Sequence, residues 1–145
     1  MRRNTRWILT VGGLAVVLIA ALAYAAISFA GGNQDLDGTH WNVIQINGQP
    51  PVAGSAVVDL SFQADQQIGG HAGCNSFGGK YLVKGRALSF SDMISTMMAC
   101  ADDALNAQES AYLQALGRVA GYDLAGDTLT LTDASGAALL VFTRA

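Results

Sequence analysis

The sequence predicts an α+β fold: a compact, antiparallel, β-rich and barrel-like domain with one main helix near residues 102–120. Three observations predict this class. Most segments after residue 38 alternate apolar and polar side chains with a period of two, as half-buried strands do. Turn residues interrupt these segments at short intervals, so we expect short antiparallel strands. One segment has the 3.6-residue apolar period of a helix, which we expect to cover one face or plug one end of a curved sheet.

Residues 1–30 predict a membrane anchor, or a signal segment, ahead of the domain. Trp7–Phe29 contains no charged residue, and its 23 residues would span roughly 34 Å as a helix, enough to cross a bilayer. Three arginines within residues 2–6 favour a cytoplasmic N-terminus. The run is longer than the apolar region of most signal peptides, which favours a retained transmembrane helix. Small residues at Ala23–Ala25 and Ser28–Ala30 keep cleavage and secretion open as an alternative.

The C-terminal domain is therefore expected on the periplasmic or extracytoplasmic side of an inner membrane that the chain crosses once. Residues 31–37 lack apolar periodicity and begin with two glycines, so they predict a linker, and residues 38–145 predict the folded domain. From Asp35 onward the chain carries eleven acidic and five basic residues, a formal charge of −6. This balance argues against a nucleic-acid partner, whose phosphates require clustered lysine and arginine.

Five strands are expected before the helix, and one further extended segment. The first is marked by Trp41, Val43 and either Ile44 or Ile46, and Asn47-Gly48 ends it. The others are Val57–Phe62, Gln66–Ala72, Lys80–Val83 and Ala87–Phe90, the last two joined by a turn at Lys84–Arg86. Met93–Ala99 is a further apolar, extended candidate.

The helix should begin at Asp102 or Asp103, whose carboxylate can cap the unpaired N–H groups of the first turn. Its apolar face is formed by Leu105, Tyr112, Leu113, Leu116 and Val119, and Gly121 is expected to close it. Three strands should follow. They lie around Tyr122–Leu124, Leu129–Leu131 and Leu139–Phe142, with turns at Gly126-Asp127 and Ala134–Gly136.

Two blocks, Gly73–Tyr81 and Ser95–Cys100, each contain one of the two cysteines, so we expect them to meet in space. In an exported domain a Cys74–Cys100 disulfide is the leading interpretation, because oxidising compartments favour it. The crosslink would close a loop of about 27 residues and stabilise the fold by roughly 3–4 kcal/mol. Two buried reduced thiols, or a functional pair, remain alternative interpretations.

The same blocks carry a resemblance to a known family. Gly-Cys-Asn-x-Phe-x-Gly-x-Tyr followed by Ser-Thr-Met-Met-Ala-Cys resembles the META domain, also called the HslJ-like family, and the resemblance covers about residues 38–145. It implies a mostly β domain of bacterial envelopes associated with heat shock and stress tolerance. It brings no catalytic residues. Met97 departs from the family, since many members carry arginine there.

No catalytic constellation stands out, and we expect neither a cofactor nor a metal. His71 and the two cysteines imitate three metal ligands, yet structural zinc takes four and a disulfide would consume both sulfurs. Asp92 could form an acid cluster with Asp102-Asp103, although helix capping explains the latter pair. Met93, Met97 and Met98 are expected in a buried strand rather than on a soft binding surface. The candidate binding residues are those of the two blocks: Asn75, Phe77, Tyr81, Thr96 and Met97.

The leading functional hypothesis is a non-enzymatic, membrane-tethered and monomeric module that binds an unknown envelope protein or other envelope component during stress. A second hypothesis is an envelope protease inhibitor, in which a rigid loop at Ser76–Gly78 enters a substrate cleft. A third is a thiol-dependent enzyme that uses Cys74.

Overall fold

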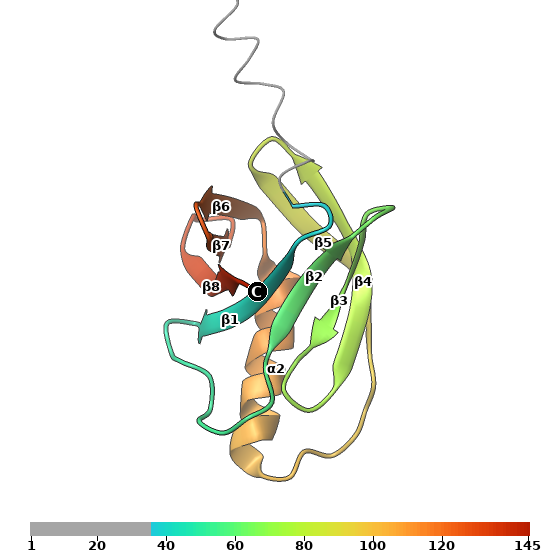
Figure 1. Cartoon of the computed structure of the whole chain (residues 1–145), viewed down its shortest axis with the longest axis vertical. Coiled ribbons are helices and arrows are strands. Elements are labelled where there is room, and N and C mark those ends of the chain that lie inside the picture. The colour runs from blue at the N-terminus through green and yellow to red at the C-terminus, as the bar shows by residue number, and fades with distance from the viewer. Residues whose placement is uncertain (1–35) are drawn as a thin grey trace, which may run out of the picture. The chain divides into compact units, whose positions relative to one another are not determined.

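Eight antiparallel strands close into a barrel in the computed structural model, which describes residues 36–145 (Figure 1). Strand order around the barrel follows chain order, and pairing of the first strand with the last closes it. The strands are β1 (His40–Ile46), β2 (Asp59–Gln63), β3 (Gln67–His71), β4 (Ser76–Lys84), β5 (Ala87–Ser95), β6 (Gly121–Ala125), β7 (Thr128–Thr132) and β8 (Ala138–Arg144). One helix, α2 (Asp103–Arg118), lies between β5 and β6 in the chain. The predicted class, an antiparallel β-rich domain with one helix, is confirmed.

Two details of the prediction are wrong. Met93–Ala99 is not a separate strand: β5 continues to Ser95, and residues 96–100 are not part of a strand. Gly121 does not close the helix, because α2 ends at Arg118 and Gly121 begins β6. Leu36, which belongs to the predicted linker 31–37, is fully buried.

Residues 1–35, which include the predicted anchor Trp7–Phe29, lie outside the described part of the chain. Within residues 36–145, α2 is too short and too polar to cross a membrane, and that range holds no other helix that could do so.

The period-two alternation places one face of each strand in the barrel interior. Leu60 and Phe62 of β2 are buried, for example, while Ser61 between them is half-exposed. Aromatic rings pack edge to face there: the Phe62 and Tyr81 ring centroids lie 5.0 Å apart at 88°, a favoured geometry. The fully buried large side chains are Leu36, Trp41, Leu60, Phe62, Leu88, Tyr112, Leu116, Leu129, Leu131, Leu140 and Phe142.

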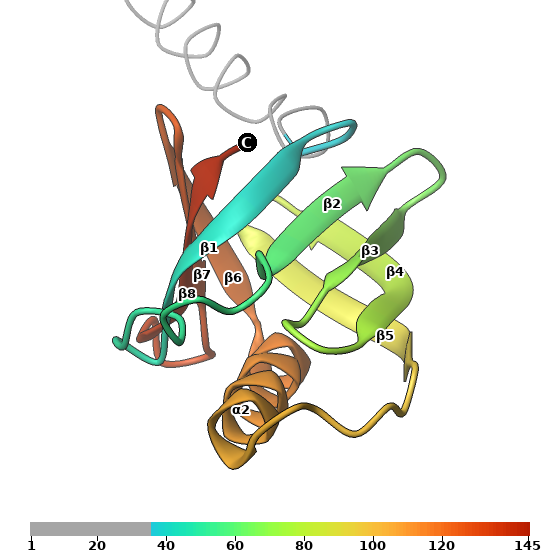
Figure 2. The same cartoon turned by 60° about the horizontal axis from the view of Figure 1, so that its bottom comes forward.

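Helix α2 lies across one end of the barrel (Figure 2). Asp102 caps it, as expected, by accepting a hydrogen bond from Leu105 N at 2.9 Å. Tyr112 is fully buried, and its hydroxyl donates to the carbonyl of Asp59 at 2.9 Å, which ties the helix to β2. Burial raises the pKa of the Tyr112 phenol well above its ordinary value. Buried Gln108 accepts from Val52 N at 2.5 Å.

Close backbone approach explains one glycine near this end of the barrel. A Cβ at Gly70 of β3 would overlap the carbonyl oxygen of Asp59 and lie 2.9 Å from the Phe77 ring. Such contacts are tighter than real side chains show, and one of the partners is backbone that cannot swing away. Only glycine therefore allows β2, β3 and the Phe77 ring to pack this closely.

We expect Gly70→Ala to lower the free energy of unfolding by about 1–3 kcal/mol, because overpacking displaces backbone. Gly117→Ala is the matched control: its new methyl group would meet nothing within 4 Å, and alanine favours helix by up to about 1 kcal/mol. Urea unfolding of both variants, followed by near-ultraviolet circular dichroism, measures the two changes. Shifts of the same sign would contradict this account.

Candidate functional site

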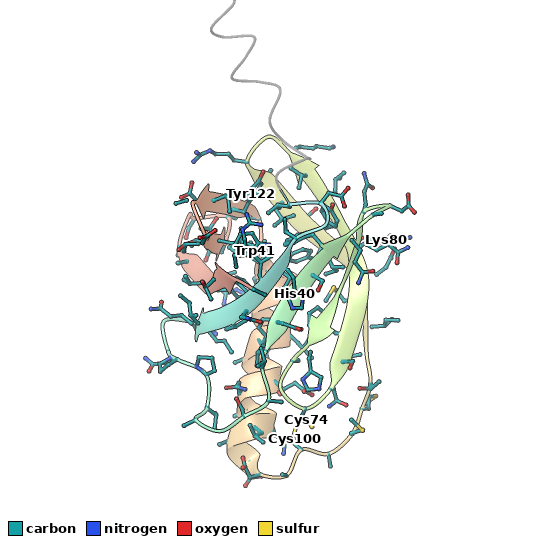
Figure 3. All side chains as sticks on the ribbon, viewed as in Figure 1. His40, Trp41, Cys74, Lys80, Cys100 and Tyr122 are labelled. Carbon is teal, nitrogen blue, oxygen red and sulfur yellow. The ribbon has the colours of Figure 1, made fainter. Side chains whose placement is uncertain are left out.

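The two cysteine blocks meet beside α2, as predicted (Figure 3). Cys74 lies between β3 and β4, and Cys100 lies in the segment that leads into the helix. Their sulfur atoms and a carboxylate oxygen of Glu109 all lie within 4.8 Å of one another. The two thiols are not bonded in this structure, so the disulfide stays a prediction.

The side chain of Asn75 is the centre of this site. It is buried, and all its hydrogen-bonding capacity is used. Its Oδ1 accepts from Thr96 Oγ1 at 2.8 Å and from Met98 N at 2.7 Å. Its Nδ2 donates to the Met98 carbonyl at 3.0 Å and to Glu109 Oε1 at 2.6 Å. One amide group therefore holds the 96–100 segment and the helix together.

Glu109 of α2 completes the network from the helix side. Its Oε2 accepts from the backbone N–H groups of Cys74 at 3.1 Å and Asn75 at 2.6 Å. Bonds from N–H donors to a carboxylate are stronger than those between neutral groups. Sequence reasoning missed Glu109, because a single acid on an amphipathic helix has the pattern of a solvated surface residue.

The Cys100 thiol keeps its proton at neutral pH. Its hydrogen bond to Cys74 raises the pKa of Cys100 to about 12, and desolvation together with the charges of Cys74, Glu109 and Asp102 acts in the same direction. A thiol with this pKa is a poor nucleophile, since the thiolate is the reactive form.

Three exposed apolar residues follow one another closely in the chain just before Cys100. We use the name apolar patch for these residues, Ile94, Met97 and Met98, whose exposed fractions are 74%, 96% and 61%. The expectation that Met97 and Met98 are buried in a strand is wrong, because the 96–100 segment bonds to Asn75 instead of continuing the sheet. Met93, by contrast, is half-buried against the core. A shallow hollow of about 380 Å³ adjoins Ile94, and Ser76, Phe77, Gly78, Ser95 and Thr96 complete its lining.

The five predicted binding residues have different positions. Asn75, Phe77 and Tyr81 are buried, while Thr96 and Met97 are exposed. The Phe77 ring packs on Tyr112, with centroids 5.7 Å apart, so it supports the core. The prediction that Ser76–Gly78 forms an inhibitory loop is wrong, because these residues belong to β4. They pair with β3 on one side, and Phe77 and Gly78 also pair with β5 on the other.

The other predicted polar groups do not gather. Asp92 pairs with Lys80 at 3.0 Å and Asp102 caps α2, and among the described residues the three aspartates do not form a cluster of metal-ligating groups. His71 is not part of the three-residue donor group. Its Nδ1 accepts from Gly73 N at 3.1 Å, and its backbone N–H donates to Asp59 Oδ1 at 2.6 Å. The other Asp59 oxygen lies 3.0 Å from His40 Nε2.

Replacing Asn75 should destabilise the domain. We expect Asn75→Ala to cost at least about 3 kcal/mol, because several part-buried partners lose bonds worth about 1–3 kcal/mol each. Asn106→Ala, at an exposed position, should cost less than about 1 kcal/mol. Urea unfolding of both variants tests this, and equal costs would remove Asn75 from the centre of the site.

Cysteine reactivity tests the thiol pair. In reduced, metal-free protein, Cys74→Ala removes the hydrogen bond that raises the pKa of Cys100, so this pKa falls and the thiolate fraction at pH 8 increases. We expect alkylation of Cys100 by iodoacetamide to accelerate at least about tenfold, after allowance for the lower nucleophilicity of a less basic thiolate. Mass spectrometry of the labelled Cys100 peptide measures the rate. An unchanged rate would mean that the sulfurs do not interact.

Comparison with known proteins identifies the architecture. The META domain family matches residues 34–145. A solved solution structure covers 76% of this chain and 92% of its own, at 25% identity and a TM-score of 0.62. A protein from Burkholderia xenovorans covers 77% and 85%, at 29% identity and a TM-score of 0.59. A DUF4847-family protein from Bacteroides vulgatus, 15% identical with a TM-score of 0.52 over 74% of this chain and 93% of its own, shares the fold.

A search of curated proteins gives no match. The family match covers the whole described barrel together with α2, and it contains both cysteine blocks. The chain therefore belongs to the META domain family.

Proposed function

We propose that this META domain is a non-enzymatic binding module of the cell envelope, which contacts a partner protein through the apolar patch during stress. The observation that carries the proposal is the exposure of Ile94, Met97 and Met98 within five residues of one another. Exposed apolar groups that gather in one place mark interaction sites more often than isolated ones do. Methionine suits this role because its flexible, polarizable side chain adapts to a partner surface.

Burial of the patch would supply part of the free energy that a specific contact needs. Full burial of a methionine or isoleucine side chain contributes about 1.5–3 kcal/mol. Association costs translational and side-chain freedom, which a pre-ordered backbone reduces. Hydrogen bonds to Asn75 fix the backbone at Met98 and the side chain at Thr96, so the residue between them is presented from an ordered segment.

The polar groups beside the patch support binding rather than catalysis. Asn75 and Glu109 are engaged in bonds that hold the fold, and Cys100 is a protonated thiol at neutral pH. The alternative of a thiol-dependent enzyme would need a reactive thiolate, and the raised pKa of Cys100 acts against it at that position.

Tethering and cellular location rest on the sequence. The uncharged run Trp7–Phe29 and the arginines before it support a single membrane span with the META domain outside the cytoplasm. An envelope stress role rests on the resemblance to the HslJ-like family. In this arrangement the partner is another envelope protein with an apolar surface.

Site-specific photocrosslinking in living cells tests the proposal. A photoreactive amino acid at Met97 of the full chain should form a defined adduct with one membrane-fraction protein, and heat shock should increase the adduct. Val57 is the matched control, because it is a large apolar residue that is 62% exposed and lies outside the patch. The same substitution at Val57 should give no such adduct.

Loss of the Met97 adduct in an Ile94→Ser, Met98→Ser background would assign binding to the whole patch. Identical adducts from positions 97 and 57, or none from position 97 with or without heat shock, would overturn the binding role of this surface.

A further inference from the structure

Three side chains of the types that can bind metal ions converge from separate segments at one end of the barrel. Cys74 comes from the loop before β4, Cys100 from the segment before α2, and Glu109 from the second turn of the helix. One ligand atom of each lies within 4.8 Å of the other two. We propose that, in the dithiol form of the protein, these three residues bind one Zn²⁺ or a similar thiophilic divalent cation, with water completing its coordination.

The spacing fits such an ion after small side-chain rotations. With Zn–S bonds of about 2.3 Å and Zn–O bonds of about 2.1 Å, tetrahedral coordination requires ligand atoms roughly 3.5–3.8 Å apart. The observed upper limit of 4.8 Å leaves at most about 1.3 Å to close. All three residues are half-buried, so the ion has a route of entry and a face open to water.

The surrounding hydrogen bonds hold the carboxylate in place before any ion arrives. Glu109 receives three bonds, from the backbone N–H groups of Cys74 and Asn75 and from Asn75 Nδ2. Oε2 accepts two of these bonds and Oε1 only one, so Oε1 is the oxygen that keeps a lone pair for a metal. Outer hydrogen bonds of this kind orient the ligands in known metal sites.

The donor set selects the class of ion. Two thiolates exclude hard cations such as Mg²⁺ and Ca²⁺, which take oxygen ligands. A carboxylate as the third donor favours Zn²⁺ over Cu⁺, which prefers sulfur alone. Binding replaces two thiol protons with one dication, and both protons are released to solvent.

Disulfide formation and metal binding exclude each other, because both use the same two sulfur atoms. A disulfide makes no use of the Glu109 carboxylate that lies beside the cysteines, whereas a cation does. The inference does not depend on the proposed partner contact, since the ligands are distinct from the apolar patch. The metal-site proposal and the partner-binding proposal can therefore be disproved independently of each other.

Cobalt titration of the full chain, purified in detergent, reduced and freed of metal, tests the site. We expect one Co²⁺ per chain, with thiolate charge-transfer absorption and the intense visible bands of tetrahedral cobalt, and we expect Zn²⁺ to abolish both. Cys74→Ser and Cys100→Ser should each weaken Zn²⁺ binding at least about 10–100-fold, as much as the loss of an outer partner does. Wild-type protein oxidised to the disulfide should bind no ion, which supplies a comparison without any mutation.

Glu109→Gln and Asp102→Asn separate ligation from general charge. Each removes one carboxylate near Cys100, and asparagine preserves the helix cap at residue 102. Glu109→Gln should weaken Zn²⁺ binding about tenfold or more, while Asp102→Asn should leave it almost unchanged. The proposal would be overturned if the reduced wild type showed no charge-transfer absorption, or if the serine variants bound Zn²⁺ as tightly as the wild type. It would also be overturned if Glu109→Gln and Asp102→Asn lost equal affinity, or if the protein bound Cu⁺ but not Zn²⁺.

Discussion

The side-chain amide of Asn75 is the interaction on which the rest of the site depends. Strand β5 ends at Ser95, and Thr96 N makes the last backbone bond to the neighbouring strand, donating to the Ser76 carbonyl of β4 at 3.0 Å. The polar groups of the backbone that follows need other partners. Asn75 provides them: it bonds both the N–H and the C=O of Met98 and the hydroxyl of Thr96. Through Glu109 the same amide connects this segment to α2. A single buried polar group thus links the 96–100 segment to the helix.

Local periodicity was sufficient to predict most strands and the helix, because burial on one face of a strand or helix imposes a repeat on the sequence. Barrel closure could not be predicted in the same way. It depends on β1 pairing with β8 across the whole domain, for example Val43 with Phe142, and no local pattern encodes such a register. The composition of Met93–Ala99 suits a strand, which is why the sequence predicts an extended segment there. The backbone of Met98 instead bonds to the side chain of Asn75, some twenty residues earlier, and no local pattern shows this.

The candidate site was predictable only in part, for similar reasons. Two cysteines in a chain that the sequence predicts to be exported imply proximity, and the sulfurs are indeed close. Glu109 could not be recognised, since its role depends on the backbone N–H groups of a loop far away in the sequence. Phe77 and Tyr81 were assigned to binding from their place in the family motif, but both are buried, so in these positions the motif describes packing.

The bonds made by Asn75 leave the side chain at position 97 free to vary in sequence. The bonds to Asn75 hold residues 96 and 98, and the Met97 side chain between them is almost fully exposed. A side chain in that place can change without altering the core or the network behind it, because nothing in either depends on its shape. The resemblance to a family in which many members carry arginine there fits this freedom. Under the proposed function, residue 97 is the place where members of the family would differ in the partner surface they recognise, apolar for methionine and acidic for arginine.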